Sequence, residues 1–111
     1  MTETGSPPQV HDDPATDADL LEVLQALSDP VRLDIVRQLA DAENPGELMC
    51  RQIRLSVTKS TASHHLKTLA RAGITAEREA GTSKFISLRR DDLDRRFPGL
   101  LDSVLQAAGT P

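Results

Sequence analysis

The sequence TKSTASHHLKTLARAG, at residues 58–73, has the marks of one well-delimited helix. Thr58 supplies a side-chain oxygen that can cap the helix N-terminus, and Gly73 can adopt the left-handed conformation in which helices often end. With 100° between successive residues, the leucines and most of the alanines fall on one side of the helix and the polar residues on the other. The pattern predicts a helix over residues 59–72 with one buried face and one outward polar face.

Two adjacent histidines in this helix, His64 and His65, raise the question of a metal site. Metal-binding pairs on a helix are spaced three or four residues apart, whereas neighbours diverge by 100° and do not share a face. We therefore expect His65 to pack and hydrogen-bond within the domain and His64 to face outward. An outward set of Ser, His and Lys side chains can contact DNA bases and phosphates, and a merely solvated face would have the same composition.

The residues before this helix predict two more helices. A helical apolar pattern begins at Asp17 and stops at the sequence SDP (28–30), where Ser28 or Asp29 can cap a second helix that starts with Pro30. Farther along, residues 48–53 have the length of one or two helical turns.

The residues after the helix predict a β-hairpin and a final helix. Residues 74–79 and 84–88 alternate in polarity, and the turn between them (80–83) is longer than the two-residue ideal. After Pro98 the pattern becomes helical again. The fold class is therefore mainly α with a small β-hairpin: a winged helix-turn-helix flanked by an N-terminal and a C-terminal helix.

The two flanking helices carry more apolar surface than so small a domain can cover. The chain has only two aromatic residues, Phe85 and Phe97, so its core depends on aliphatic side chains. We therefore expect the flanking helices to pair across a homodimer interface. The candidate interface residues are Leu20, Leu21, Leu24, Leu100, Leu101, Val104 and Leu105.

Charge is distributed unevenly along the chain. The net charge is −4, but residues 51–90 carry nine Lys and Arg against two Asp and Glu. A basic block inside an acidic protein is typical of local contact with a polyanion, although a chance cluster of solvated cations remains the alternative. Residues 1–16 are acidic and rich in Pro, Gly, Ser and Thr, which predicts a flexible tail before a folded domain at 17–108.

Several function classes have no support in the sequence. A single cysteine, Cys50, excludes a disulfide within the chain, and the short apolar runs exclude a membrane span. The N-terminus does not look like a secretory signal, so we expect a cytoplasmic protein. No nucleophile–base set, phosphate-binding glycine loop or cofactor motif is visible, so we expect neither an enzyme nor a bound cofactor.

Two stretches resemble the arsenic-repressor (ArsR/SmtB) family of winged-helix regulators. One is ALSDPVRLDIVRQL (26–39), which is similar to the motif at the start of the family's winged-helix domain. The other is STASHHLKTLARAGI (60–74), which is similar to the family's recognition helix. The resemblance spans about residues 18–106 and implies a bacterial homodimeric repressor that binds a palindromic operator in double-stranded DNA. Together with the outward face and the hairpin, it predicts these DNA contacts: Thr58, Lys59, Ser60, Thr61, Ser63, His64, Lys67, Arg71, Arg78 and Lys84.

The chain departs from the family at its metal sites. Many members carry a Cys-x-Cys where this chain reads ELMCRQI (47–53), so Met49 and Arg51 replace the expected ligands. The final residues, 91–108, contain aspartates but no histidine for the second family site. We therefore expect no metal. Cys50 fits a small packed side chain better than a redox switch, which would need a partner thiol.

The expected function is thus a DNA-binding transcriptional repressor without the usual metal sites. An unidentified small-molecule inducer, or regulation by the protein's own abundance, stays open at this point. The alternative is a winged-helix protein-interaction module, such as an antirepressor, that does not bind DNA.

Overall fold

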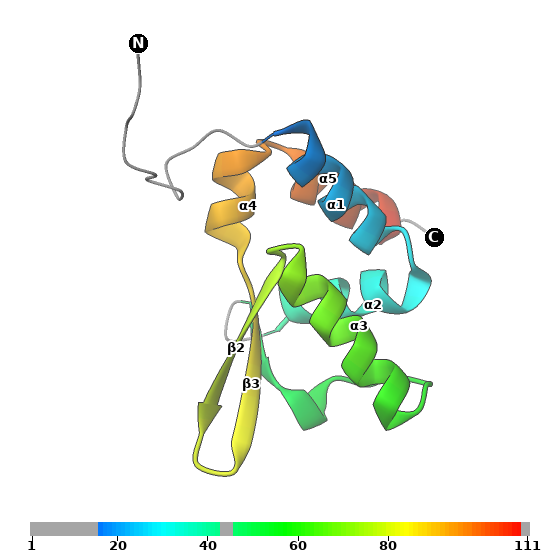
Figure 1. Cartoon of the computed structure of the whole chain (residues 1–111), viewed down its shortest axis with the longest axis vertical. Helices are drawn as coiled ribbons and strands as arrows, with labels where there is room; N and C mark the ends of the chain where they lie inside the picture. The colour runs from blue at the N-terminus through cyan, green and yellow to red at the C-terminus, as the bar shows by residue number, and fades with distance from the viewer. Residues whose placement is uncertain (1–15, 43–45, 110–111) are drawn as a thin grey trace.

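The computed structural model describes residues 16–42 and 46–109. The predicted tail (1–16) lies outside these residues except for Thr16. Figure 1 shows the helices gathered at one end and a β-hairpin projecting beside the third helix. The elements are α1 Asp17–Leu27, α2 Pro30–Ala40, β1 Glu47–Met49, the 3₁₀ turn η2 Cys50–Gln52, α3 Lys59–Arg71, β2 Thr75–Ala80, β3 Ser83–Leu88, α4 Arg90–Arg96 and α5 Leu100–Ala108.

Side-chain caps fix where the first helices begin. The Thr16 hydroxyl accepts from the Asp19 backbone N–H, and the Asp19 carboxylate accepts from the Thr16 N–H, both at 3.1 Å. Asp29, one of the two predicted caps, accepts from the backbone N–H groups of Val31 and Arg32 at 2.8 and 3.1 Å. These bonds satisfy amides that have no partner inside their helices. The predicted starts of both helices are confirmed.

The sheet contains the predicted hairpin, with a tighter turn than expected. β3 lies between β1 and β2, and both pairings are antiparallel. Ala80 pairs with Ser83, so only Gly81 and Thr82 form the turn, and the prediction of a longer loop is wrong. Gly81 has φ +63°, a conformation that the missing Cβ makes accessible and that suits a two-residue hairpin.

The segment at 48–53 is also different from its prediction. We expected one or two helical turns, but Glu47–Met49 forms β1 and only Cys50–Gln52 is helical, as a 3₁₀ turn. Leu48 pairs with Ile86, far along the chain. A three-residue strand held by a distant partner leaves no periodic pattern in its own sequence.

A shared aliphatic core joins these elements. Ile35, Leu39, Leu69, Ile74 and Ile86 have no exposed surface, so α2, α3 and the sheet meet at one centre. No helix within residues 16–42 and 46–109 is both long and apolar enough to cross a membrane.

The first helix has apolar residues on two sides. Val23, Ala26 and Leu27 are buried in the core, whereas Leu21 and Leu24 are 63% and 40% exposed. No other large apolar side chain in the described residues is classed as exposed. Leu21 and Leu24 therefore form an apolar strip on α1 that residues 16–42 and 46–109 leave exposed.

The C-terminal helix lies against α1 (Figure 1), and residues of both helices line one small cavity. Leu100, Val104 and Leu105 are half-buried. Leu101 is only 3% exposed because it belongs to the chain's own core. The predicted interface set therefore needs a correction: Leu101 supports the surface from beneath and cannot form it.

Candidate nucleic-acid interface

Helix α3 is built to present one polar face. The Thr58 hydroxyl accepts from the Thr61 N–H at 3.3 Å at its start, and Gly73 with φ +81° ends it. The buried residues of α3 are His65, Leu66 and Leu69. The exposed residues of the helix and its cap are Thr58, Lys59, Ser60, Thr61, Ser63, His64, Lys67 and Arg71.

The two histidines have separate surroundings, as their spacing predicted. His64 is exposed, whereas His65 is buried, 9% exposed, with its Nδ1 3.1 Å from Nη1 of Arg32. Arg32 also donates through Nε to the Ala26 carbonyl at 2.7 Å. Because a guanidinium can only donate, this contact is a hydrogen bond in the tautomer that leaves Nδ1 free to accept. His65 thus fixes α3 against the α1–α2 connection.

Asp29 lies beside this contact. Its carboxylate caps α2 and lies 4.0 Å from Nδ1 of His65. The backbone N–H of Arg32 is the main cause that lowers the pKa of Asp29, with the N–H of Val31 and the charge of Arg32 adding to it. The carboxylate that caps α2 thus lies beside the contact that holds α3.

Arg78, a predicted DNA contact of the wing, forms an ion pair within the sheet. Its Nε and Nη2 donate to the two Glu47 carboxylate oxygens at 3.0 and 3.1 Å, and its guanidinium lies 4.3 Å from the Phe85 ring centroid. The same bond lowers the pKa of Glu47. Arg78 pairs with Phe85 in register, on the face of the hairpin opposite that of Glu77 and Lys84. Structurally it fastens β2 to β1 across β3.

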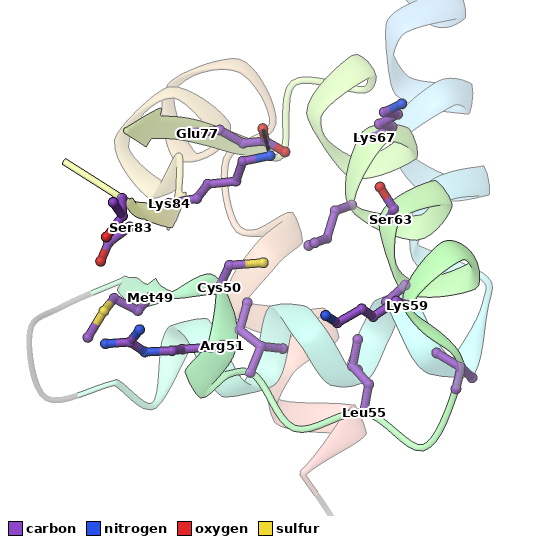
Figure 2. Close-up of a pocket in the computed structure, with 15 residues that line it drawn as sticks. Met49, Cys50, Arg51, Leu55, Lys59, Ser63, Lys67, Glu77, Ser83 and Lys84 are labelled. Carbon is purple, nitrogen blue, oxygen red and sulfur yellow. Dashed lines mark ion pairs between the residues drawn. The ribbon is translucent and has the colours of Figure 1, made fainter. Parts of the chain in front are cut away.

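A groove separates α3 from the wing (Figure 2), with a volume of about 740 Å³. Its apolar floor is lined by two buried side chains, Ile53 and Leu66, and by three half-buried ones, Leu55, Val57 and Ala62. Its charged rim consists of Arg51, Lys59, Lys67, Glu77 and Lys84. Figure 2 shows the Cys50 sulfur and the Lys59 ammonium directed into the space between the walls.

The structure brings only part of the predicted set together. Lys59, Ser63, Lys67 and Lys84 line the same groove, and Lys84 lies 3.5 Å from the Glu77 carboxylate. The predicted α3 positions that do not line the groove are Ser60, Thr61, His64 and Arg71. These two sets give α3 a groove side and an outer side.

Sequence reasoning did not select two residues of this surface. Arg51 lines the groove, but the sequence drew attention to it only as a replaced metal ligand. Thr82 forms the tip of the wing, and only the correct turn length identifies it as the tip. The sequence did contain a signal for Arg51, because this residue is the first cation of the basic block at 51–90.

Known proteins are similar in sequence to this chain. Residues 27–78 match a family model described as a helix-turn-helix domain. The chain is 39% identical over 85 residues to the helix-turn-helix-type transcriptional regulator YceK of Bacillus subtilis. The aligned residues cover 75% of this chain and 83% of YceK. The chain belongs to the helix-turn-helix transcriptional regulators.

Solved structures of other proteins share the fold of this chain. One is the homodimeric winged helix-turn-helix DNA-binding domain Mb0332 of Mycobacterium bovis, described as a possible ArsR-family regulator. Its TM-score is 0.62 at 24% identity, and the match covers 89% of this chain and 94% of that one. The transcriptional repressor BigR of Xylella fastidiosa gives a TM-score of 0.64 at 23% identity, with 85% and 89% covered. The winged fold and the resemblance to ArsR/SmtB regulators are thereby confirmed.

Within residues 16–42 and 46–109 of this regulator, no three His, Cys, Asp or Glu side chains come together as a potential metal site. Cys50 is half-buried and lines the groove.

Proposed function

We propose that this regulator is a homodimeric repressor that binds a two-fold symmetric operator through α3 and the wing. The exposed polar and basic face of α3 carries the proposal. Ser60, Ser63 and His64 offer hydroxyl and imidazole groups for base edges, and Lys59 and Lys67 offer charge for phosphates. The buried His65–Arg32 contact holds this face in one orientation. A preset recognition helix suits the major groove of B-DNA.

The uncovered strip on α1 supports the dimer. Leu21 and Leu24 of α1 are exposed and Val104 and Leu105 of α5 are half-buried, so a second copy can cover the apolar side chains of both helices. The M. bovis domain of similar fold is described as homodimeric. Two α3 helices related by a two-fold axis would reach half-sites about 34–36 Å apart.

Selection of bound fragments from the organism's own genome tests this function. The recovered sites are expected to share a palindrome, and fluorescence anisotropy should show that the chain prefers them to scrambled DNA by about 10³-fold or more. Uniformly weak binding to every fragment would contradict the proposal.

The wing lysine permits a second, finer test. Lys84→Ala is expected to weaken binding to cognate and scrambled DNA alike and to reduce the salt-dependence slope by about one, because it removes one phosphate contact. Arg37→Ala on the exposed side of α2 removes an equal charge and should leave both quantities unchanged. A selective loss of cognate binding in Lys84→Ala would show that Lys84 reads sequence.

One observation favours a second candidate, a protein-interaction module without DNA binding. Both predicted wing cations lie beside carboxylates, Arg78 beside Glu47 and Lys84 beside Glu77. Such a wing attracts DNA less than a free basic hairpin would. The genome selection distinguishes the candidates, since a module of this class recovers no shared site.

A further inference from the structure

The groove between α3 and the wing has a floor that DNA binding does not require. Ile53 and Leu66, only 9% and 8% exposed, line the groove together with Leu55, Val57 and Ala62. Phosphates gain nothing from an aliphatic floor, and among major-groove base edges only the thymine methyl does. Its volume of about 740 Å³ lies within the range of about 300–1,000 Å³ that is typical of small-molecule sites.

The charged rim of the groove is strongly biased in sign. Lys59, Lys67 and Lys84 are all the lysines of the chain, and every one of them lines this groove. Arg51 adds a fourth cation, while Glu77 is the one carboxylate among the lining residues. A lysine stem can lie along apolar surface while its ammonium reaches a ligand at the rim.

We propose that this groove binds a small amphipathic anion: an apolar body on the floor and a carboxylate or sulfonate held by Lys59. The positive charges of the rim attract the negative group of the ligand, and the aliphatic floor buries its apolar body. Figure 2 shows the Lys59 ammonium directed into the groove. Binding of the anion does not depend on the proposed function. Only its effect on DNA binding rests on that function.

That consequence follows from shared side chains. Lys59, Ser63, Lys67 and Lys84 line the groove and belong to the proposed DNA contacts. A ligand that covers them competes with DNA, so the anion acts as an inducer of a repressor. At a free ligand concentration ten times its own Kd, mass action lowers the apparent DNA affinity about tenfold.

Direct binding is tested first, on the full chain without DNA. Decanoate is the probe, kept below its micelle-forming concentration, with decan-1-ol as the neutral comparison and decyltrimethylammonium as the cationic one. Calorimetry and backbone amide shifts are expected to place decanoate on α3, η2 and the wing, with a higher affinity than either comparison. Equal binding of decanoate and decan-1-ol would overturn the anion requirement, and shifts confined to other elements would overturn the site.

A matched pair of variants tests the rim. Lys59→Gln and Arg37→Gln each remove one positive charge from an exposed helical position, but only Lys59 lines the groove. Lys59→Gln is expected to weaken decanoate binding about fivefold, as for an accessible ion pair, and Arg37→Gln to leave it unchanged. Equal effects of the two substitutions would reduce the proposal to general electrostatic attraction and so overturn it.

The DNA experiment separates this inference from the proposed function. Release of operator DNA by decanoate, with the predicted dependence on its concentration, supports both. Operator binding that decanoate does not affect overturns the inducer role and leaves the proposed function standing. Decanoate binding by a chain that binds no DNA overturns the proposed function and leaves the ligand site standing.

Discussion

At the scale of single residues, the adjacent histidines show how helical geometry separates the roles of neighbours. His65 joins α3 to Arg32, and through Arg32 to the carbonyl of Ala26, whereas His64 is exposed. The sequence predicted this division because it follows from a local angle of 100°. It did not predict Arg32 as the partner, because a contact between residues 33 positions apart depends on the packing of α2 against α3.

Substituting each histidine by alanine is expected to give opposite results. His65→Ala should lower the free energy of unfolding by about 1–3 kcal/mol, because it removes a buried side chain and its hydrogen bond. His64→Ala should change stability by less than about 0.5 kcal/mol and weaken specific DNA binding by about 1–3 kcal/mol. Urea denaturation and anisotropy measure the two quantities. A stable His65→Ala protein would contradict the anchoring role.

The helix cap Asp29 predicts how stability depends on pH. Its pKa is lowered in the folded state, chiefly by the backbone N–H of Arg32, so the folded protein binds a proton less readily than the unfolded chain. This contribution is complete above the ordinary carboxyl pKa of about 4 and is lost as the pH falls through the lower folded-state value. Asp29→Asn keeps a good capping oxygen and is expected to show a smaller loss on acidification.

Denaturant unfolding at about pH 6 and about pH 2 measures this difference. The two proteins should differ little at the higher pH, by less than about 1 kcal/mol, because Asn and Asp are comparable caps. Parallel losses in both proteins on acidification would assign the pH dependence to other carboxyls, such as Glu47, whose pKa is also lowered.

At the scale of elements, helix boundaries were predictable and the sheet was only partly so. Thr58, Asp29 and Gly73 act on their own backbone neighbourhood, so their roles are legible in the sequence. The strand β1 is held by β3 and by the Glu47–Arg78 pair, whose members lie 31 positions apart. Only the folded chain shows why residues 47–49 are extended.

The wing turn gives a prediction at this scale. Gly81→Val is expected to destabilise the protein by about 1–2 kcal/mol, because a β-branched residue resists the positive φ that the turn needs. Gly81→Asn should cost less, since Asn adopts this conformation more readily and a Cβ there meets no atom within 4 Å. Thermal unfolding of both variants checks the order, and an equal cost would point to a cause other than backbone conformation.

At the scale of the whole molecule, the apolar strip on α1 links the fold to assembly. The sequence indicated surplus apolar surface on the flanking helices, and Leu21 and Leu24 are indeed exposed. It could not indicate that Leu101 belongs to the core, because the leucines of α5 look alike until α1 and α2 are in place.

Leu21→Glu is expected to convert a dimer into monomers, since it places a charge in the proposed interface and disturbs no buried side chain. Ala76→Glu adds the same charge at an exposed position of β2 and should leave assembly unchanged. Analytical ultracentrifugation measures both, and an unchanged dimer in Leu21→Glu would place the interface elsewhere.

The gathering of every lysine and the single cysteine around one groove has a practical side. Apart from the terminal amine, conjugation chemistry aimed at amines or thiols can reach this chain only at that surface. Dyes or sensor chips coupled in this way would obstruct the groove whose occupancy they were meant to report. Conversely, a bound molecule that shields the groove slows acylation of all three lysines at once, so mass spectrometry of the labelled peptides becomes a direct footprint of its occupancy.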